Sequence, residues 1–171
     1  TLLTSYPICS SSGALGPKRQ QGDRQVPEGF YPIQGFNPKS AFWLSMQVDY
    51  PNEADKIVAK RLGIDKLGGH IFIHGSCATI GCIPITDDLI KELYPIVYDA
   101  SARRKVTVHI FPTRLNEAGL AHLRALGRPR SGAGEDLLAF WENMKDGYEA
   151  FEKTHSLPKI RVTAAGKYAF E

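Results

Sequence analysis

The sequence has no hydrophobic run that approaches the roughly 20 apolar residues needed to span a membrane as a helix. It also has no block of lysine and arginine, and its 21 basic and 18 acidic residues leave a formal net charge of only +3. We therefore expect neither a membrane span nor a nucleic-acid-binding arm, although a weakly basic surface suits an anionic substrate. The charged and apolar segments of an export signal are also missing from the start, so we expect any such signal to have been removed upstream.

Cysteine is scarce, with Cys9, Cys77 and Cys82 as the only three in 171 residues. Because three is an odd number, at least one thiol stays unpaired within a monomer, which disfavours a disulfide framework and leaves room for a reactive cysteine. The chain does not need such a framework, since its length and its 43% of hydrophobic residues suffice to bury a core. We expect one globular domain formed by residues 1–171.

The hydrophobic pattern predicts a β-rich first part and a mainly helical last part. Apolar runs, several of them alternating, predict strands at residues 1–8, 30–35, 42–49, 70–74 and 105–111. Capping residues and a helical period predict helices at residues 52–62, from 86 onward, at 116–126 and at 135–154. Turn-forming residues predict a long surface loop at 9–29, a turn at 37–38 and a loop at 127–134. Pro95 is expected to kink or restart its helix, and the stripe Leu137, Trp141, Met144 and Tyr148 is expected to pack into a core.

The segment IHGSCATIGCIP, residues 73–84, contains the residues with the clearest chemistry. His74 ends a short buried run and lies eight positions before Cys82, which follows a glycine. A thiolate is a strong nucleophile, and an imidazole close to it can take the thiol proton and lower the pKa of the cysteine. This pair suits acyl transfer through a thioester. The alternative is structural: His74 is a satisfied core histidine and Cys82 a buried, inert thiol.

Two further groups in this segment have expected roles. No aspartate or glutamate lies between His74 and Cys82, so the carbonyl of Gly75 is the nearest group that can fix the imidazole tautomer. Backbone N–H groups around Gly81 and Cys82 are candidates for an oxyanion hole.

These residues resemble the catalytic domain of L,D-transpeptidases (YkuD type), whose signature is a histidine, a gap, and then Ser/Thr-His-Gly-Cys. Here His74-Gly75 supplies the first half and residues 79–82, TIGC, the second. The upstream segment VPEG, residues 26–29, resembles the family's Thr-Pro-x-Gly element. The resemblance covers residues 1–111 and is strongest to a branch with a short His-to-Cys gap, to which a murein-trimming hydrolase also belongs.

The resemblance implies a mixed, β-rich fold with a sandwich or barrel core at about 1–111 and appended helices at about 112–171. It implies that Cys82 attacks a peptidoglycan stem peptide, that His74 moves the proton, and that Gly75 orients the imidazole. Gly81 and Thr79 would belong to the oxyanion loop. An acceptor amine would then give a crosslink, and water would give trimming. The family works outside the cytoplasm and needs neither cofactor nor metal.

Two departures from the family pattern matter. The family's second histidine is Ile80 here, so His74 must act as the base. The arginine that often follows the cysteine is replaced by Ile83-Pro84, so carboxylate recognition must come from elsewhere, with Arg114 and Lys18 as candidates.

Other interpretations of the same residues remain open at this point. Cys77 is expected to be structural and could pair with Cys9 if the chain is exported. A metal site could form from His70, His74, Cys77 and Cys82, although this spacing is not a usual zinc pattern. A wall-binding module without catalysis could use the same fold. The oligomeric state is not predicted.

Overall fold

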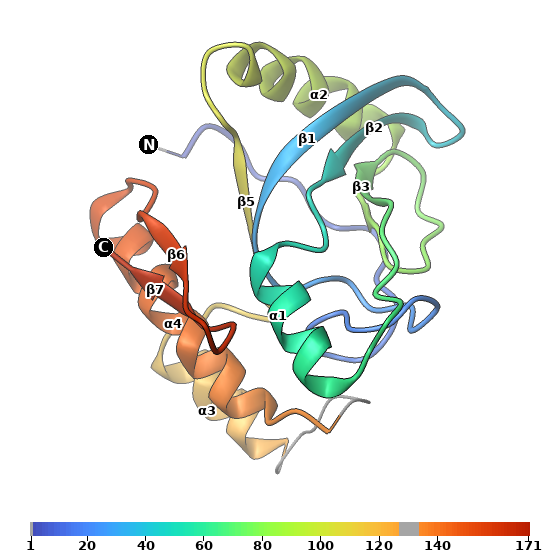
Figure 1. Cartoon of the computed structure of the whole chain (residues 1–171). Helices are drawn as coiled ribbons and strands as arrows, with labels where there is room; N and C mark the ends of the chain where they lie inside the picture. Colours follow the sequence, from blue (N-terminus) through green and yellow to red (C-terminus); the bar gives the residue numbers. More distant parts are fainter. Residues whose placement is uncertain (1, 127–133) are drawn as a thin grey trace. The chain divides into compact units, whose positions relative to one another are not determined.

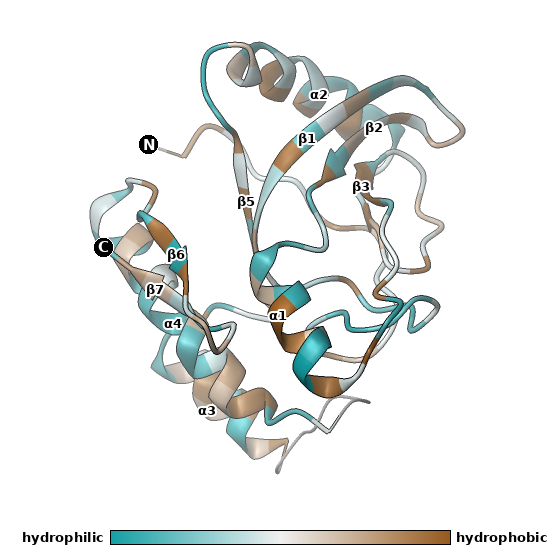
Figure 2. Ribbon diagram, in the orientation of Figure 1, coloured by the Kyte–Doolittle hydropathy of each residue, from teal (hydrophilic) through white to brown (hydrophobic). Residues whose placement is uncertain are grey.

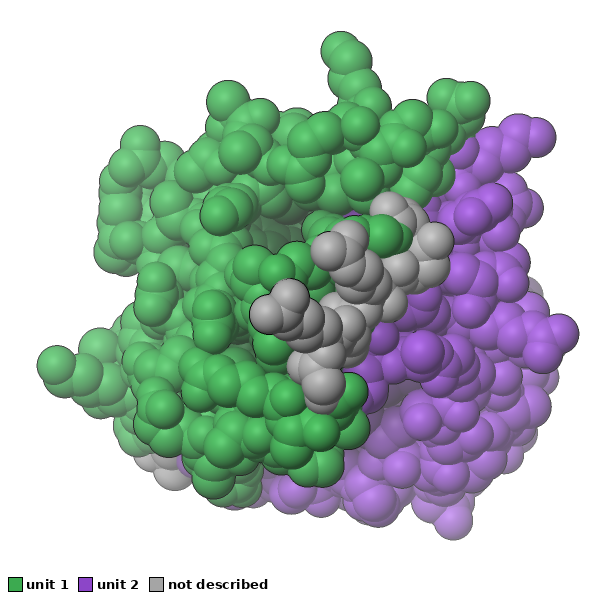
Figure 3. Space-filling model, turned by 90° about the horizontal axis from the view of Figure 1, so that it is seen from below, with its two compact units in different colours: residues 1, 52–65, 111–171 green, residues 2–51, 66–110 purple. Residues whose placement is uncertain are grey.

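A computed structural model describes residues 2–126 and 134–171. The chain divides into two compact units, which Figure 3 shows in two colours. The described residues of the first unit fall within 52–65 and 111–171, and the second unit comprises residues 2–51 and 66–110. The loop expected at 127–134 lies outside the described residues, except for Gly134.

The second unit is built on a five-stranded sheet with the strand order β4-β3-β2-β1-β5. Its strands are β1 (Gly29–Ser40), β2 (Trp43–Val48), β3 (Ile71–His74), β4 (Ile83–Pro84) and β5 (Thr107–Ile110). Neighbouring strands are antiparallel except for β3 and β4, which run parallel. Helix α2 (Asp87–Ser101), labelled in Figure 1, belongs to the same unit by its residues. The curled five-stranded sheet, together with the helices of the described residues, confirms the expected mixed, β-rich fold class.

The core of this unit follows from the two-residue period of the strands. Ile71 and Ile73 of β3 and Ile83 of β4 point to the same buried face, where they meet Met46 and Val48 of β2. Ile90 of α2 is fully buried against this cluster. Burial of a large aliphatic side chain stabilises a fold by about 1.5–3 kcal/mol, so this face fixes the register of the strands. The opposite face of β3 carries Phe72 and His74.

Several expectations for the second unit are wrong. The expected turn at 37–38 lies inside β1, which continues to Ser40 and absorbs Pro38 in an irregular register between Asn37 and Ser40. Such irregularities tolerate proline, which has no N–H for the ladder. No strand forms at residues 2–8, where Leu2, Leu3 and Ile8 are 82%, 83% and 61% exposed and lack a partner strand.

The surface loop expected at residues 9–29 has no regular element up to residue 28, since Gly29 already begins β1, but it is not entirely at the surface. Residues 16–19 are buried, including the side chains of Lys18 and Arg19. Helix α2 begins where the sequence predicts and continues through Pro95, so the helix does not restart there.

The first unit contains the helices that the capping signals predict. They are α1 (Glu53–Leu62), α3 (Glu117–Ala125) and α4 (Leu137–Thr154). Asn52 forms a capping box with Asp55, and Gly63 ends α1 in the left-handed region with φ 67°. Figure 2 shows hydrophobic and hydrophilic sides on α1 and α4, which is the pattern of helices that pack on one face.

A core of aliphatic and aromatic side chains holds the first unit together. Trp141 and Met144 of α4 are fully buried, and Leu120 and Leu123 of α3 are exposed by no more than 1%. Of the stripe expected on the last helix, Leu137, Trp141 and Met144 are confirmed as core residues, whereas Tyr148 is only half-buried. A two-stranded antiparallel sheet, β6 (Ile160–Val162) and β7 (Tyr168–Phe170), was not expected, because strands of three residues give no readable period. None of the helices in the described ranges is long and apolar enough to cross a bilayer.

Candidate active site

His74 is the last residue of β3 and is almost completely buried, with 1% of its surface exposed. Its Nδ1 atom is hydrogen-bonded to the carbonyl oxygen of Gly75, the contact that the sequence suggested. A carbonyl oxygen only accepts, so Nδ1 carries the hydrogen and donates it. In the neutral ring this leaves Nε2 as the basic nitrogen, which is the tautomer that a general base needs.

The imidazole is also held by packing. The ring of Phe42, which precedes β2, lies over it with centroids 4.6 Å apart and planes tilted by 31°. Ser45 of β2 is the register partner of His74 and is itself 3% exposed. The histidine ring therefore has little freedom to turn away from its position at the end of β3.

Gly75 occupies a position where no side chain fits. A Cβ atom built on it would lie 2.5 Å from Oδ1 of Asp87 and 2.7 Å from the carbonyl oxygen of Phe42. The next residue, Ser76, has a positive φ of 61° and donates its N–H to Oδ1 of Asp87 at 2.7 Å. The turn after β3 is thus fixed to the first residue of α2, a link that sequence reasoning missed.

A disulfide ties the following loop to the start of the chain. Cys9 and Cys77 are bonded, with their Cα atoms 5.6 Å apart. The N–H of Cys9 also donates to the carbonyl of Pro84 in β4 at 3.0 Å. The conditional expectation that Cys77 pairs with Cys9 is therefore met. The metal site that included Cys77 is wrong, because a disulfide sulfur is no longer available as a thiolate ligand.

Thr79 holds the segment that leads into Cys82. Its hydroxyl donates to the carbonyl of Cys82 at 2.8 Å and accepts the N–H of Gly81 at 3.2 Å. Gly81 has a φ of 132°, which side chains rarely adopt, and a Cβ there would lie 3.0 Å from the carbonyl of Gln25. The Gly81 N–H, expected to line an oxyanion hole, thus has an internal partner in this structure.

Cys82 is the one cysteine outside the disulfide, and it is partly buried. Continuing the β3–β4 register, in which Ile73 pairs with Ile83, by one residue places Cys82 beside Phe72. Cys82 directly precedes β4, whose neighbouring strand β3 ends in His74.

The thiol of Cys82 is not bonded to His74. Its Sγ donates instead to the carbonyl of His70 at 3.7 Å, and the described residues show no hydrogen bond between Sγ and the imidazole. Burial raises the pKa of the Cys82 thiol, although a backbone hydrogen bond from Phe72 and the charge of Lys18 lower it in part. The expectation of a lowered thiol pKa is therefore wrong for the resting structure: the sulfur is held as a thiol.

Cys82 opens onto a pocket of about 750 Å³ within the second unit. Its walls come from the 18–24 loop, from the 68–71 segment before and at the start of β3, and from the loop that carries the cysteine. The lining residues are Lys18, Gln21, Gly22, Arg24, Gly68, Gly69, His70, Ile71, Ile80, Gly81 and Cys82. A pocket of this size accommodates a small peptide or amino-acid group next to the sulfur.

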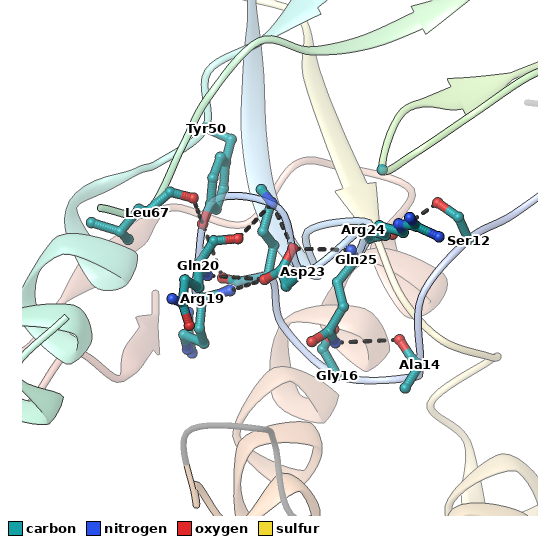
Figure 4. A network of polar contacts seen from close by, with 12 residues as sticks. Ser12, Ala14, Gly16, Arg19, Gln20, Asp23, Arg24, Gln25, Tyr50 and Leu67 are labelled. Atoms are coloured by element: carbon teal, nitrogen blue, oxygen red, sulfur yellow. Dashed lines mark hydrogen bonds and ion pairs between the residues drawn. The ribbon is translucent and has the colours of Figure 1, made fainter. Parts of the chain in front are cut away.

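Lys18 lines this pocket, but its charge is already paired. Its Nζ lies 2.6 Å from Oδ1 of Asp23 and donates to the carbonyl of Gln20 at 2.9 Å. Figure 4 shows that the Asp23 carboxylate also accepts the N–H groups of Arg19, Gln20 and Gln25. Burial would raise the pKa of Asp23, but the Lys18 ammonium and these backbone groups outweigh it and keep that pKa below its usual value. The Lys18–Asp23 pair thus shapes the loop.

Arg24 is the cation that sequence reasoning missed. It is exposed, lines the pocket with Cys82, and forms no ion pair with any residue that the structure describes. The tyrosine hydroxyl of Tyr50 meanwhile anchors the same loop through the carbonyl of Lys18 at 3.0 Å. Arg114, the other predicted substrate-binding residue, belongs to the first unit and is exposed there. Its role stays a prediction.

The fold and this site define a class: a curled mixed sheet with a free cysteine directly before one strand and a tautomer-fixed histidine at the end of the neighbouring strand. Comparison with known families agrees. The L,D-transpeptidase catalytic domain family (YkuD) matches residues 1–110, and the chain belongs to this family.

Curated relatives extend the match along the whole chain. The chain is 35% identical over 171 residues to the Escherichia coli K12 protein named "Putative L,D-transpeptidase YafK". The matched region covers 98% of this chain and 63% of that protein. The protein of the same name from Escherichia coli O157:H7 gives the same values. The chain thus spans less than two thirds of the length of these relatives.

Solved structures give more distant matches. The helical cell shape determining protein Pgp2 from Campylobacter jejuni is 19% identical with a TM-score of 0.46, covering 90% of this chain and 62% of that chain. Bd1075 from Bdellovibrio bacteriovorus is 18% identical with a TM-score of 0.39, covering 86% of this chain and 65% of that one.

Proposed function

We propose that this chain is a cysteine acyltransferase that acts on peptidoglycan stem peptides through a thioester on Cys82. One observation carries the proposal: in a member of this family, the free cysteine directly precedes β4 and opens onto a pocket of about 750 Å³, and the neighbouring strand β3 ends in a histidine whose Nε2 is the basic nitrogen. Residues 1–171 would work as a single catalytic domain, with the sheet of the first 111 residues carrying the site.

The first half of the reaction forms the thioester. The Sγ proton passes to Nε2 of His74 while Sγ bonds to the carbonyl carbon of the stem peptide, giving an oxyanion. The oxyanion collapses and the scissile C–N bond breaks, and the leaving amine takes the proton from Nε2. Thr79 keeps the backbone around Gly81 and Cys82 in place as charge develops on the oxygen.

The second half releases the acyl group. An acceptor amine, such as the side-chain amine of diaminopimelate, attacks the thioester carbonyl and gives a crosslink. Water in the same role gives a trimmed stem. In both cases His74 takes a proton from the attacking group, the C–S bond breaks, and Sγ recovers its proton.

The raised pKa of Cys82 sets the order of events. A thiol that is neutral at rest must lose its proton as it attacks. The Cys82 thiol therefore has to come within hydrogen-bond distance of the His74 imidazole when substrate binds. Rotation about the Cα–Cβ bond of Cys82 would exchange the weak contact with the His70 carbonyl, at 3.7 Å, for one with His74. Hydrogen bonds of this kind are often long in free enzymes and tighten with substrate.

The basic side chains that line the pocket are the groups that recognise the substrate. Stem peptides carry carboxylates, and an arginine binds a carboxylate with two parallel hydrogen bonds. Arg24 is exposed and lines the pocket, so it takes the place of the family arginine that is absent after Cys82. Arg114 and the paired Lys18 are secondary candidates.

The disulfide supports a place outside the cytoplasm. Cys9 and Cys77 are bonded, and structural disulfides persist in oxidising compartments such as the periplasm. A peptidoglycan substrate is found there as well. We therefore propose an extracytoplasmic location, with stem peptides as the partner.

The test is to incubate the protein with purified muropeptides and follow both protein and products by mass spectrometry. We expect a mass adduct on Cys82, together with crosslinked dimers for transpeptidation or shortened monomers for hydrolysis. The Cys82→Ala variant is the control and should give neither. Binding to sacculi without adduct or turnover on any muropeptide would contradict the enzyme and favour a non-catalytic wall-binding module.

A further inference from the structure

The peptide group between Gly75 and Ser76 is hydrogen-bonded at both of its polar ends. Its carbonyl oxygen accepts Nδ1–H of His74, and its N–H donates to Oδ1 of Asp87 at 2.7 Å. A peptide unit is planar, with its C=O and N–H pointing to opposite sides. One rigid group therefore connects the imidazole to the carboxylate.

We propose that Asp87 is a positioning residue for His74 and acts on it through this single peptide group. The inference rests on the proposed function, in which His74 is the base. Hydrogen bonds in a chain polarise one another, so a carboxylate at the N–H end makes the carbonyl at the other end a better acceptor. The Gly75 carbonyl then holds the imidazole more firmly and stabilises the positive charge that the ring gains when it takes the thiol proton.

The arrangement supplies a carboxylate that the sequence motif lacks. No acidic residue lies between His74 and Cys82, whereas many catalytic histidines are oriented by a direct bond to a carboxylate. Here the carboxylate lies eleven positions after Ser76 and reaches the imidazole with one peptide group between them.

Asp87 is not explained by helix capping alone. An acidic residue in the first turn of α2 suits the helix dipole, and Asp88 in the same turn serves that role while fully open to solvent, with its side chain 90% exposed. A capping side chain accepts an N–H of its own helix, and the N-cap residue Thr86 makes no such bond. The hydrogen bond of Asp87 leaves the helix and ends on Ser76.

The packing around Gly75 shows that the contact is close. A Cβ on Gly75 would lie 2.5 Å from Oδ1 of Asp87 and 3.2 Å from Cγ2 of Ile90. The carboxylate therefore lies directly against the Gly75–Ser76 turn. Ser76, with φ 61°, is held in a conformation that non-glycine residues seldom adopt. A turn with this backbone needs a strong partner, and Asp87 provides one.

Two substitutions separate the charge from the hydrogen bond. Asp87→Asn keeps an oxygen that accepts the Ser76 N–H but removes the charge, whereas Asp87→Ala removes both. Asp88→Asn is the matched control, because it makes the same charge change in the same helical turn at a likewise exposed aspartate whose carboxylate pairs with Lys91 at 3.2 Å and not with Ser76. Thermal unfolding measured on all three variants shows whether each one folds.

The first measurement is steady-state turnover of muropeptides. We expect kcat to fall by about 10-fold to 100-fold, the cost usual for losing a group that orients a functional histidine, with Asp87→Ala worse than Asp87→Asn. KM should stay the same, since Asp87 is not among the residues that line the pocket. If both Asp87 variants keep the kcat of Asp88→Asn, or if only KM changes, the inference is wrong.

The second measurement does not depend on turnover. The hydrogen-bonded Nδ1–H of His74 should give a proton NMR resonance protected from exchange with water, assigned by its loss in His74→Ala. We expect this resonance to move in Asp87→Asn, to exchange faster or vanish in Asp87→Ala, and to stay in Asp88→Asn. A resonance unchanged in both Asp87 variants would overturn the inference. Absent turnover with an Asp87-sensitive resonance would instead contradict the proposed function alone.

Discussion

The histidine and the cysteine of the site are held very differently, although only eight positions separate them. His74 is 1% exposed, its Nδ1 is bonded to Gly75, and Phe42 covers its ring. Cys82 is partly exposed, and the contacts described for its Sγ are to backbone groups: the carbonyl of His70 at 3.7 Å and a backbone hydrogen bond from Phe72. The proposed base is thus preorganised, whereas the sulfur of the proposed nucleophile has no hydrogen bond to the imidazole among the described residues.

This difference fits the demands on the two groups. A base that must accept a proton at one nitrogen gains from a fixed tautomer, and fixing it in advance costs nothing during the reaction. A nucleophile forms and breaks a covalent bond, so its sulfur must move between the thiol, the tetrahedral intermediate and the thioester. Four predictions test whether rigidity at the His74 end and mobility at the Cys82 end both matter.

The largest effect is expected at the rigid end, from Gly75→Ala. The new Cβ would lie 2.7 Å from a backbone oxygen of Phe42 and 2.5 Å from Asp87, so backbone has to move. Overpacking of this kind costs about 1–3 kcal/mol of stability, and we expect a loss of turnover of about 100-fold as the Gly75 carbonyl shifts.

Thermal unfolding and turnover check this prediction against Gly35→Ala. Gly35 lies in the same sheet, and a Cβ there would meet only the Gln47 side chain, at 3.4 Å. Equal effects of the two substitutions would show that the space around Gly75 has no special importance.

The sequence was informative where neighbouring residues decide the outcome. Helix α1 could be predicted because Asn52 and Gly63 cap it locally, and the Gly75 carbonyl was suggested by the absence of nearby acids. Asp87 could not be found in this way, because its bond to Ser76 depends on where α2 begins relative to the end of β3.

Charge pairing in the 18–24 loop shows the same limit. The sequence offers Lys18 as a candidate for carboxylate recognition, yet its ammonium is already paired with Asp23 at 2.6 Å. Arg24 belongs to no sequence motif that would have pointed to it. Its importance comes from the pocket, whose walls combine residues from three separate stretches of the chain.

The second largest effect is expected from the Thr79 clamp beside the cysteine. Thr79→Val keeps the size of the side chain but removes the hydroxyl that bonds both Gly81 and Cys82. Each such bond contributes about 1 kcal/mol, so losing both from the transition state corresponds to a fall in kcat of about 30-fold. Thr79→Ser keeps the hydroxyl and should stay close to wild type. A valine variant as active as the serine variant would mean that the loop needs no clamp.

A smaller effect is expected on substrate binding at Arg24. Arg24→Gln should raise KM for a donor with a free carboxylate by about 10-fold, because one charge-assisted hydrogen-bonded contact is lost. A donor whose carboxylate is amidated is the control: wild type and variant should then have the same KM. If the two donors respond equally to the substitution, Arg24 does not read the carboxylate.

The smallest effect concerns the resting thiol and tests the mobile end directly. Because burial raises the pKa of Cys82, little thiolate is present at neutral pH, and iodoacetamide should react slowly there. The rate should climb as the pH passes the value of a free thiol, about 8.5, since only the thiolate reacts. With Cys9 and Cys77 bonded to each other, the adduct should form on Cys82 alone.

In the absence of substrate, His74→Ala should leave the rate at neutral pH nearly unchanged, because Sγ contacts the His70 carbonyl rather than the imidazole. Fast alkylation below pH 7 that disappears in His74→Ala would show an ion pair already formed at rest, and both ends of the site would then be preorganised.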